Sequence, residues 1–224
     1  MTQVIAIRPE PGLSATLNAG RDLGLEITGT PLFEIRGLDW DVPDPERFDA
    51  LLIGSANAIR HGGENLQAFL RKPAYVVGKS TESAARAAGF SIASVGSGGL
   101  QGVLDAVEPP VRLLRIAGAE HVPLTPPEGV SFETVIAYES VALPLDAAMF
   151  AGNTGRLIVL LHSAAAAEHF AAECARLGIA RSGIEIAVLG PRIASAAGKE
   201  WRAIHVSPRP NDVDLLAMVR GLCQ

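Results

Sequence analysis

Short aliphatic runs alternate with alanine-rich stretches along the chain, and this alternation limits the fold more than any other feature. Ala50–Ile53, Leu157–Leu161 and Ile184–Leu189 are the clearest predicted strands. Segments with helical spacing of apolar residues follow, and several end at a glycine. Strands that alternate with helices predict an α/β fold in which helices flank parallel sheets.

Three of the predicted helices lie beside candidate functional residues. Leu66, Phe69 and Leu70 predict one helix, which we expect Pro73 to end. Ser83–Ala88 predicts a second, closed by Gly89. A third is predicted to start at Ile193 and to run to Ala197.

The order of strands and helices occurs twice in the chain. The matching segments are Leu52–Ala58 with Leu160–Ala166, Tyr75–Gly78 with Ala187–Gly190, and Gly24–Ile27 with Gly129–Phe132. The shift between copies lies between 105 and 112 residues each time. This repeat predicts two similar lobes from an internal duplication, with ligands bound in a cleft at the carboxyl ends of parallel strands.

Composition excludes several classes of protein. The net charge of -5 and the absence of a Lys/Arg cluster argue against a nucleic-acid partner. Two cysteines, Cys174 and Cys223, are too few for a disulfide scaffold, so we expect a reducing cytoplasm. The longest aliphatic run, Leu157–Leu161, is too short to span a membrane, and the first residues do not resemble a signal peptide.

A serine follows the predicted strand at one kind of strand-to-helix junction. Ser55, Ala56 and Asn57 form this junction in the first copy, and Ser163 stands at the same point in the second. A serine at a helix start can cap free backbone N–H groups. The same N–H groups and the hydroxyl can also hold an anion, so both interpretations stay open.

A glycine and a basic residue mark the other kind of junction. In the first copy this is Gly78 to Thr81, which includes Lys79, and in the second it is Gly190, Pro191 and Arg192. The pattern is a weak phosphate-loop resemblance, but it lacks Gly-x-x-x-x-Gly-Lys, which argues against nucleotide triphosphate hydrolysis. No Gly-x-Gly-x-x-Gly follows the first strand, which disfavours a nicotinamide dinucleotide.

Other catalytic sets are poorly matched. The five histidines show no His-x-x-x-His pair, so no metal site is predicted. Ser163 lacks the flanking glycines of a nucleophile elbow. A racemase with two catalytic thiols would need them at strand ends, whereas Cys174 falls within a predicted helix. Tyr138 ends the extended segment before it, so packing and proton donation are both open roles.

The order of these motifs resembles the uroporphyrinogen-III synthase family of tetrapyrrole biosynthesis. The motifs are, in order, Arg8-Pro9 with Gly12, Ser55 to Ala58, Gly78 to Thr81 with Ala87 to Gly89, Tyr138, Ser163, and Gly190-Pro191. The resemblance covers nearly the whole chain. It rests on the order and spacing of the motifs, since none of them is specific by itself.

For the fold, the resemblance implies two α/β lobes joined by a two-stranded linker. Residues 1–33 and 142–224 would form one discontinuous lobe that contains both termini. Residues 38–137 would form the other lobe, and residues 34–37 and 138–141 the linker.

For function, the resemblance implies a cofactor-independent, cyclising lyase of haem biosynthesis. The substrate would be hydroxymethylbilane, a linear tetrapyrrole polycarboxylate, which loses water and closes through a spiro intermediate with inversion of ring D. No cofactor, metal, nucleic acid or membrane is expected. We expect a cytoplasmic monomer, with room for a transient contact with the upstream deaminase.

The resemblance also implies roles for individual residues. Tyr138 would be catalytic, helping the hydroxyl to depart. Substrate-binding residues would be Arg8, Ser55, Ala56, Asn57, Lys79, Thr81, Ser163, Gly190, Pro191 and Arg192. Gly54 and Ile193 depart from the family pattern, because threonine is common at the first position and frequent at the second.

Two further functions remain as alternatives. A non-catalytic, two-lobed protein could bind a small anionic ligand at the same helix starts. A plain flavin-type α/β domain is less favoured, because the repeat implies two lobes and aromatic residues make up only 5% of the chain.

Overall fold

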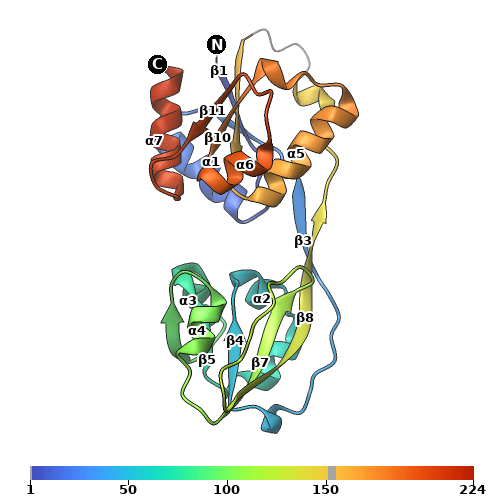
Figure 1. The fold of residues 1–224 in the computed structure, drawn as a ribbon, viewed down its shortest axis with the longest axis vertical. Helices are drawn as coiled ribbons and strands as arrows, with labels where there is room; N and C mark the ends of the chain where they lie inside the picture. Colours follow the sequence, from blue (N-terminus) through green and yellow to red (C-terminus); the bar gives the residue numbers. More distant parts are fainter. Residues whose placement is uncertain (1, 151–154) are drawn as a thin grey trace. The chain divides into compact units, whose positions relative to one another are not determined.

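Two compact units make up the chain. The computed structural model describes residues 2–150 and 155–224. Contacts divide the chain into unit 1, which is Met1–Glu34 with Val141–Gln224, and unit 2, which is Ile35–Ser140. Each unit has its own sheet (Figure 1) and its own hydrophobic core.

Unit 1 is built on a five-stranded parallel sheet with the order β11-β10-β9-β1-β2. Its helices and strands are β1 (Thr2–Ala6), α1 (Gly12–Asp22), β2 (Ile27–Gly29), β9 (Arg156–Leu161), α5 (Ala164–Leu177), β10 (Ile184–Val188), α6 (Pro191–Ala197), β11 (Ala203–Val206) and α7 (Asp212–Cys223). Short 3₁₀ turns stand at Ala147–Met149 and Arg181–Gly183. The central strands are aliphatic throughout, as expected for a sheet covered on both faces.

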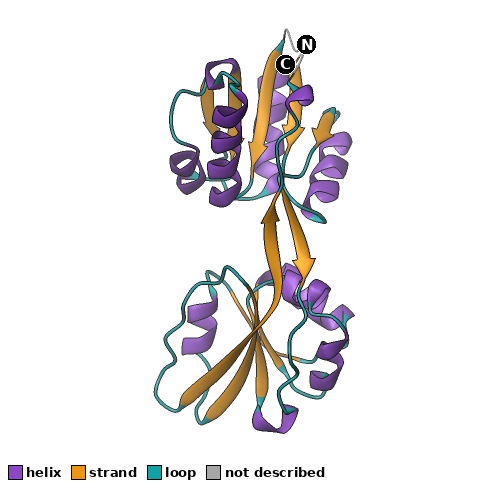
Figure 2. Ribbon diagram, turned by 90° about the vertical axis from the view of Figure 1, so that its right-hand side faces the viewer, coloured by secondary structure: helices purple, strands orange, loops and turns teal. Residues whose placement is uncertain are grey.

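Helices cover both faces of the unit 1 sheet (Figure 2). On one face α5 and α6 bury Phe170, whose ring stacks on Trp201 with centroids 5.4 Å apart. On the other face α1 and α7 bury Leu13, Leu215 and Leu216. Successive residues of a strand point to opposite faces, so each central strand contributes to both cores.

Unit 2 has a six-stranded sheet with the order β3-β8-β7-β4-β5-β6. Its helices and strands are β3 (Phe33–Gly37), β4 (Ala50–Ile53), α2 (Ala56–His61), β5 (Ala74–Val77), α3 (Gly78–Ala87), β6 (Ile92–Gly96), α4 (Leu100–Asp105), β7 (Val111–Gly118) and β8 (Val130–Ala142). Short 3₁₀ turns stand at Pro45–Arg47 and Glu64–Phe69. The strands β4 to β8 are parallel.

The edge strand β3 pairs with β8 in the opposite direction. The Leu38 N–H donates to the Ala137 carbonyl at 2.9 Å, and the Leu143 N–H donates to the Leu32 carbonyl at 2.9 Å. Residue numbers rise along one strand as they fall along the other, which is the antiparallel pattern. Both strands continue from one unit into the other along the chain.

Both faces of the unit 2 sheet are also covered. α2, the turn at Glu64–Phe69 and α3 bury Phe69 and Ala85 on one face. α4 covers the other face with Leu100, Val103 and Leu104. These two layers confirm the predicted class of parallel sheets flanked by helices.

The two sheets have the same internal arrangement, which confirms the predicted duplication. β9, β10 and β11 occupy the places that β4, β5 and β6 occupy in the other sheet, and β1 and β2 correspond to β7 and β8. Gly24 and Gly129 stand before the two equivalent strands β2 and β8, with φ of 74° and 77°. Such positive φ angles favour glycine, so the glycine occurs at the same point of both copies because the backbone turn requires it.

One predicted helix is of another type than expected, and two predicted helix starts were wrong. The segment from Glu64 to Phe69 is a 3₁₀ helix, because the apolar spacing of three between Leu66 and Phe69 also fits its three residues per turn. α3 starts at Gly78, so Lys79 and Thr81 belong to its first turns. α6 starts at Pro191, since proline suits the first position of a helix.

A buried carboxylate ties the segment before β9 to helix α5. Glu173 is 7% exposed, and its Oε2 accepts the Leu145 N–H at 2.7 Å. Arg176 donates to both carboxylate oxygens at 2.7 Å. The hydrogen bond from Arg176 and then that from Leu145 lower the pKa of Glu173 to about 2, against the opposing effect of burial.

We predict that Glu173→Gln destabilises unit 1 in a pH-dependent way. The folded pKa of about 2 lies below the ordinary 4.5, so the ionised carboxylate stabilises the fold above about pH 4.5. Its contribution is lost as the pH falls towards 2. We expect a loss of about 2 kcal/mol in urea unfolding at pH 7. The gap from the wild-type protein should narrow at pH 3, and Glu168→Gln, an exposed carboxyl on the same helix, should cost little at either pH.

Candidate functional site

Each unit has a cavity at the carboxyl ends of its central strands. The unit 2 cavity has a volume of about 290 Å³ and is lined by residues that include Gly54, Ser55, Val77, Leu100, Arg115 and Tyr138. The unit 1 cavity has a volume of about 460 Å³ and is lined by residues that include His162, Ser163, Leu189, Gly190, Pro191 and Arg192. Open α/β sheets bind ligands at these strand ends.

The serine junctions cap their helices in both units. The Ser55 hydroxyl accepts the Asn57 N–H at 3.2 Å, and the Ser163 hydroxyl accepts the Ala166 N–H at 3.1 Å. Capping uses an oxygen lone pair and leaves the hydroxyl hydrogen available as a donor. Since both serines also line a cavity, capping and anion binding are compatible here.

The glycine junctions start helices that lack a side-chain cap. α3 begins at Gly78 after Val77, and α6 begins at Pro191 after Gly190. Gly78 has φ of 75°, which an L side chain rarely adopts. Each cavity therefore lies beside a helix start capped by serine and beside at least one start without a side-chain cap, since α4 also begins uncapped at the unit 2 cavity. An uncapped start presents backbone N–H groups suited to an anion.

Tyr138 is placed by a break in the pairing of β7 and β8. The register shifts between Ala117 and Gly118, so that Tyr138 rather than Ala137 stands opposite Gly118. Such a bulge changes the direction of a side chain. A Cβ on Gly118 would lie 2.7 Å from Cε2 and Cζ of Tyr138, so the ring occupies the space that the glycine leaves open. Tyr138 lines the unit 2 cavity.

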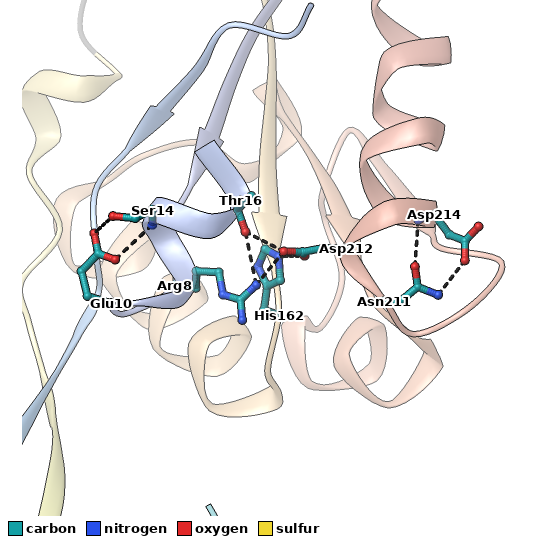
Figure 3. Close-up of polar contacts among 8 residues, drawn as sticks. All are labelled: Arg8, Glu10, Ser14, Thr16, His162, Asn211, Asp212 and Asp214. Atoms are coloured by element: carbon teal, nitrogen blue, oxygen red, sulfur yellow. Dashed lines mark hydrogen bonds and ion pairs between the residues drawn. The ribbon is translucent and has the colours of Figure 1, made fainter. Parts of the chain in front are cut away.

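Arg8 takes part in a polar network within unit 1 (Figure 3). Its Nη1 lies 2.8 Å from Oδ2 of Asp212 and 3.2 Å from the Thr16 hydroxyl. The Thr16 hydroxyl donates to Asp212 at 2.8 Å, and His162 Nε2 lies 2.7 Å from the other carboxylate oxygen. These four residues join the loop after β1, α1, the end of β9 and the start of α7.

The electrostatic centre of this network is Asp212. Burial raises the pKa of Asp212, but the hydrogen bond and charge of His162, the Thr16 hydroxyl and Arg8 outweigh burial, so the net shift is downward. The carboxylate is therefore held ionised. His162 lines the cavity, and its Nδ1 is buried without a hydrogen-bond partner.

The predicted site residues divide between the two units. Ser55 and Tyr138 share the unit 2 cavity. Ser163, Gly190, Pro191 and Arg192 share the unit 1 cavity. Five predicted residues lie outside the described lining of both cavities: Arg8, Ala56, Asn57, Lys79 and Thr81. Ala56 is buried at the start of α2, Lys79 is exposed, and Thr81 is 4% exposed within α3.

Three polar residues at these sites were not singled out from the sequence. These are Asp212 and His162 in unit 1 and Arg115 in unit 2. Arg115 lies in an aliphatic strand, two residues after Leu113. Arg115 and Leu113 point to the same face of the strand, because successive side chains alternate between the two faces. This spacing was the signal that could have indicated a buried charge.

The described ranges 2–150 and 155–224 contain neither a candidate metal-ion cluster nor a helix that could span a membrane. Within them, no three His, Cys, Asp or Glu side chains gather closely enough to hold a metal ion. No helix in those ranges has the length and apolar character needed to cross a membrane.

Duplicated parallel sheets, each with a cavity at the carboxyl ends of its strands, define an α/β protein of two similar units. The chain matches the family model for uroporphyrinogen-III synthase HemD over residues 14–217. Because the match spans most of the chain, this protein belongs to that family.

Solved structures show the same fold. A uroporphyrinogen-III synthetase from Helicobacter pylori matches at 15% identity and a TM-score of 0.67, covering 99% of this chain and 100% of the other. A mutant uroporphyrinogen III synthase from Thermus thermophilus matches at 17% identity and a TM-score of 0.56, covering 99% and 97%. No curated protein sequence gave a significant match.

We predict that Gly118→Ala displaces the Tyr138 ring, because the new methyl group would lie 2.7 Å from two ring carbons. The ring resonances should shift in NMR spectra, and overpacking should cost about 1–3 kcal/mol in stability. Gly102→Ala is the control, since its Cβ meets open space on α4 and alanine favours a helix. A Tyr138 ring left in place by Gly118→Ala would contradict the assignment.

Proposed function

We propose that this protein is a uroporphyrinogen-III synthase, which converts hydroxymethylbilane into the type III macrocycle in haem biosynthesis. The family match over residues 14–217 carries the proposal, because it spans both units and therefore both cavities. The proposal includes residues 34–37 and 138–141 as the linker between the two lobes.

Departure of water is the step assigned to Tyr138. The C–O bond of the terminal hydroxymethyl group breaks, and the pyrrole nitrogen supplies the electron pair that stabilises the resulting cation. The Tyr138 hydroxyl helps the leaving oxygen by donating a proton or a hydrogen bond, so that the oxygen departs as water. The position of Tyr138 at the unit 2 cavity supports this role.

Ring closure depends on orientation. The substituted carbon of ring D attacks the cation to form the spiro intermediate. The older bond from this carbon to the methylene of the preceding ring then breaks, which leaves a cation on that methylene. The free α-carbon of ring D attacks this cation and loses its proton, so ring D is inverted in the closed macrocycle. The step neither oxidises nor reduces the substrate, so its chemistry is satisfied by a proton donor and a positioned chain without a cofactor. The protein has to hold the tetrapyrrole so that the correct carbon meets the cation.

Substrate carboxylates are assigned to the donors at the helix starts. Ser55 in unit 2, and Ser163 and Arg192 in unit 1, line the cavities. The uncapped start of α6 adds the backbone N–H groups of Gly190 and Arg192, because Pro191 has no N–H group. These local donors compensate for the overall charge of -5, which would otherwise repel a polycarboxylate.

In this proposal the protein is a cytoplasmic monomer. It takes its substrate from the upstream deaminase, and the contact between the two enzymes is only transient. Arg8 anchors the unit 1 network, so we assign it an indirect part in binding through His162 and Asp212.

The direct test couples the protein to an upstream deaminase and separates the oxidised porphyrin isomers by chromatography. We expect an excess of type III over type I, because the enzyme holds ring D for inversion. A mixture containing only type I, which forms spontaneously, would contradict the proposal and leave a non-catalytic binder of anions.

We predict that Tyr138→Phe lowers kcat by about 10²-fold, the lower range for a general acid, and changes KM much less. The fold should persist, since the ring that packs against Gly118 is kept. Tyr75→Phe is the matched control, because Tyr75 is the other tyrosine of the chain and lies within β5. Equal rates for both variants would remove Tyr138 from the reaction.

A further inference from the structure

Arg115 is a charged side chain in the middle of an aliphatic core. It lies on β7 between Leu114 and Ile116 and is only 4% exposed. The alternation of the strand places it on the same face as Leu113, which packs beneath α4. It also lines the unit 2 cavity together with Tyr138.

The guanidinium of Arg115 is incompletely bonded. Its Nη2 donates to the Val122 carbonyl at 2.8 Å, whereas its Nε is buried without a partner. No described carboxylate forms an ion pair with it, and Glu120, which also lines the cavity, is exposed. Burial lowers the pKa of Arg115, while nearby Tyr138 acts in the opposite direction, and an arginine keeps its charge at neutral pH.

The other buried charges of the described chain are all paired. Glu173 is bound by Arg176, and Glu185 is bound by Arg156, with two contacts of 2.7 Å in each pair. An unpaired buried charge is costly, because the lost hydration is not replaced. Arg115 is therefore the one buried ion among the described residues whose counter-charge the chain itself does not supply.

The duplicated unit shows that the fold does not need this cation. Leu52 of β4 pairs with Arg115, and its counterpart in the repeat, Leu160 of β9, pairs with Ala6. Ala6 is fully buried in the corresponding core layer of unit 1. A small apolar residue thus satisfies the same structural position, so packing does not account for the arginine.

We propose that Arg115 binds one carboxylate of the substrate and thereby holds the pyrrole ring that bears it beside Tyr138. The identity of the ligand as a pyrrole carboxylate rests on the proposed function, whereas the anion site rests on geometry alone. A guanidinium carries five N–H donors in a planar fork, and the printed contact uses one of them, from Nη2 to Val122, so donors remain for the two oxygens of a carboxylate. Binding supplies the counter-charge that the chain itself does not provide.

The first experiment titrates the protein with pyrrole-3-propionate and with its methyl ester. The NMR resonance of the Arg115 Nε–H group is identified as the one missing from Arg115→Lys. We expect the acid to move this resonance in a saturable way and the ester to leave it unmoved. A resonance unmoved by the acid would overturn the proposal.

Variants then separate binding from folding. In Arg115→Gln, we expect the acid to bind at least tenfold more weakly than in the wild-type protein, as followed by the Gly118 backbone amide. We expect KM for hydroxymethylbilane to rise about tenfold or more, with a smaller change in kcat. Without ligand, Arg115→Gln should be at least as stable as the wild-type protein, because the substitution removes an unpaired buried charge. If the arginine were purely structural, the substitution would lower the stability.

The matched control is Arg112→Gln, which removes an exposed cation three residues earlier on the same strand. Arg112 contacts Glu133 and lies outside the cavity lining, so binding and KM should not change. Equal affinity of the wild-type protein and Arg115→Gln for the acid would overturn the proposal. If Arg115→Gln does not fold, the wild-type titration decides.

The two proposals fail in different ways. Saturable binding of the acid at Arg115 in a protein that yields only type I porphyrin would uphold the anion site and reject the synthase activity. Excess type III porphyrin with no response at Arg115 would uphold the activity and reject the anion site.

Discussion

Burial of both faces of each parallel sheet is the constraint on which the rest of the structure depends. Helices pack on either side, so the central strands are mostly aliphatic and leave little room for polar chemistry. Most polar residues that line the cavities lie where strands end and helices begin. Both cavities lie there, which explains why serines, glycines and a tyrosine at these junctions are the functional candidates.

The strand ends were readable from the sequence, because an aliphatic run followed by glycine or serine marks a junction wherever it occurs. The predicted parallel α/β class and its duplication followed from this pattern, and both are confirmed by the order of strands in the two sheets. The first residues of helices were harder to predict from the sequence. Lys79 and Ser80 are polar residues outside the core and gave no sign that α3 already begins at Gly78.

Side-chain placement at the site was only partly predictable. Tyr138 was recognisable as the end of an extended segment, but its direction depends on a register shift opposite Gly118 that no local pattern encodes. Arg8 contacts Asp212, which lies 204 positions away and in turn contacts His162, so this network depends on tertiary structure. The role of Arg115 was hidden because aliphatic neighbours made its strand resemble an ordinary core strand.

The two duplicated units differ in how their arginine side chains are paired. Unit 1 carries Arg8 just beyond β1 and satisfies it with Asp212 and the Thr16 hydroxyl, so its cation consolidates helix contacts. Unit 2 carries Arg115 inside β7, where unit 1 has Ala6, and leaves the charge without an internal partner. A paired cation adds to the stability of its own unit, whereas an unpaired one retains its attraction for an incoming anion. The two units therefore share one scaffold but differ in the position at which a positive charge is available to a ligand.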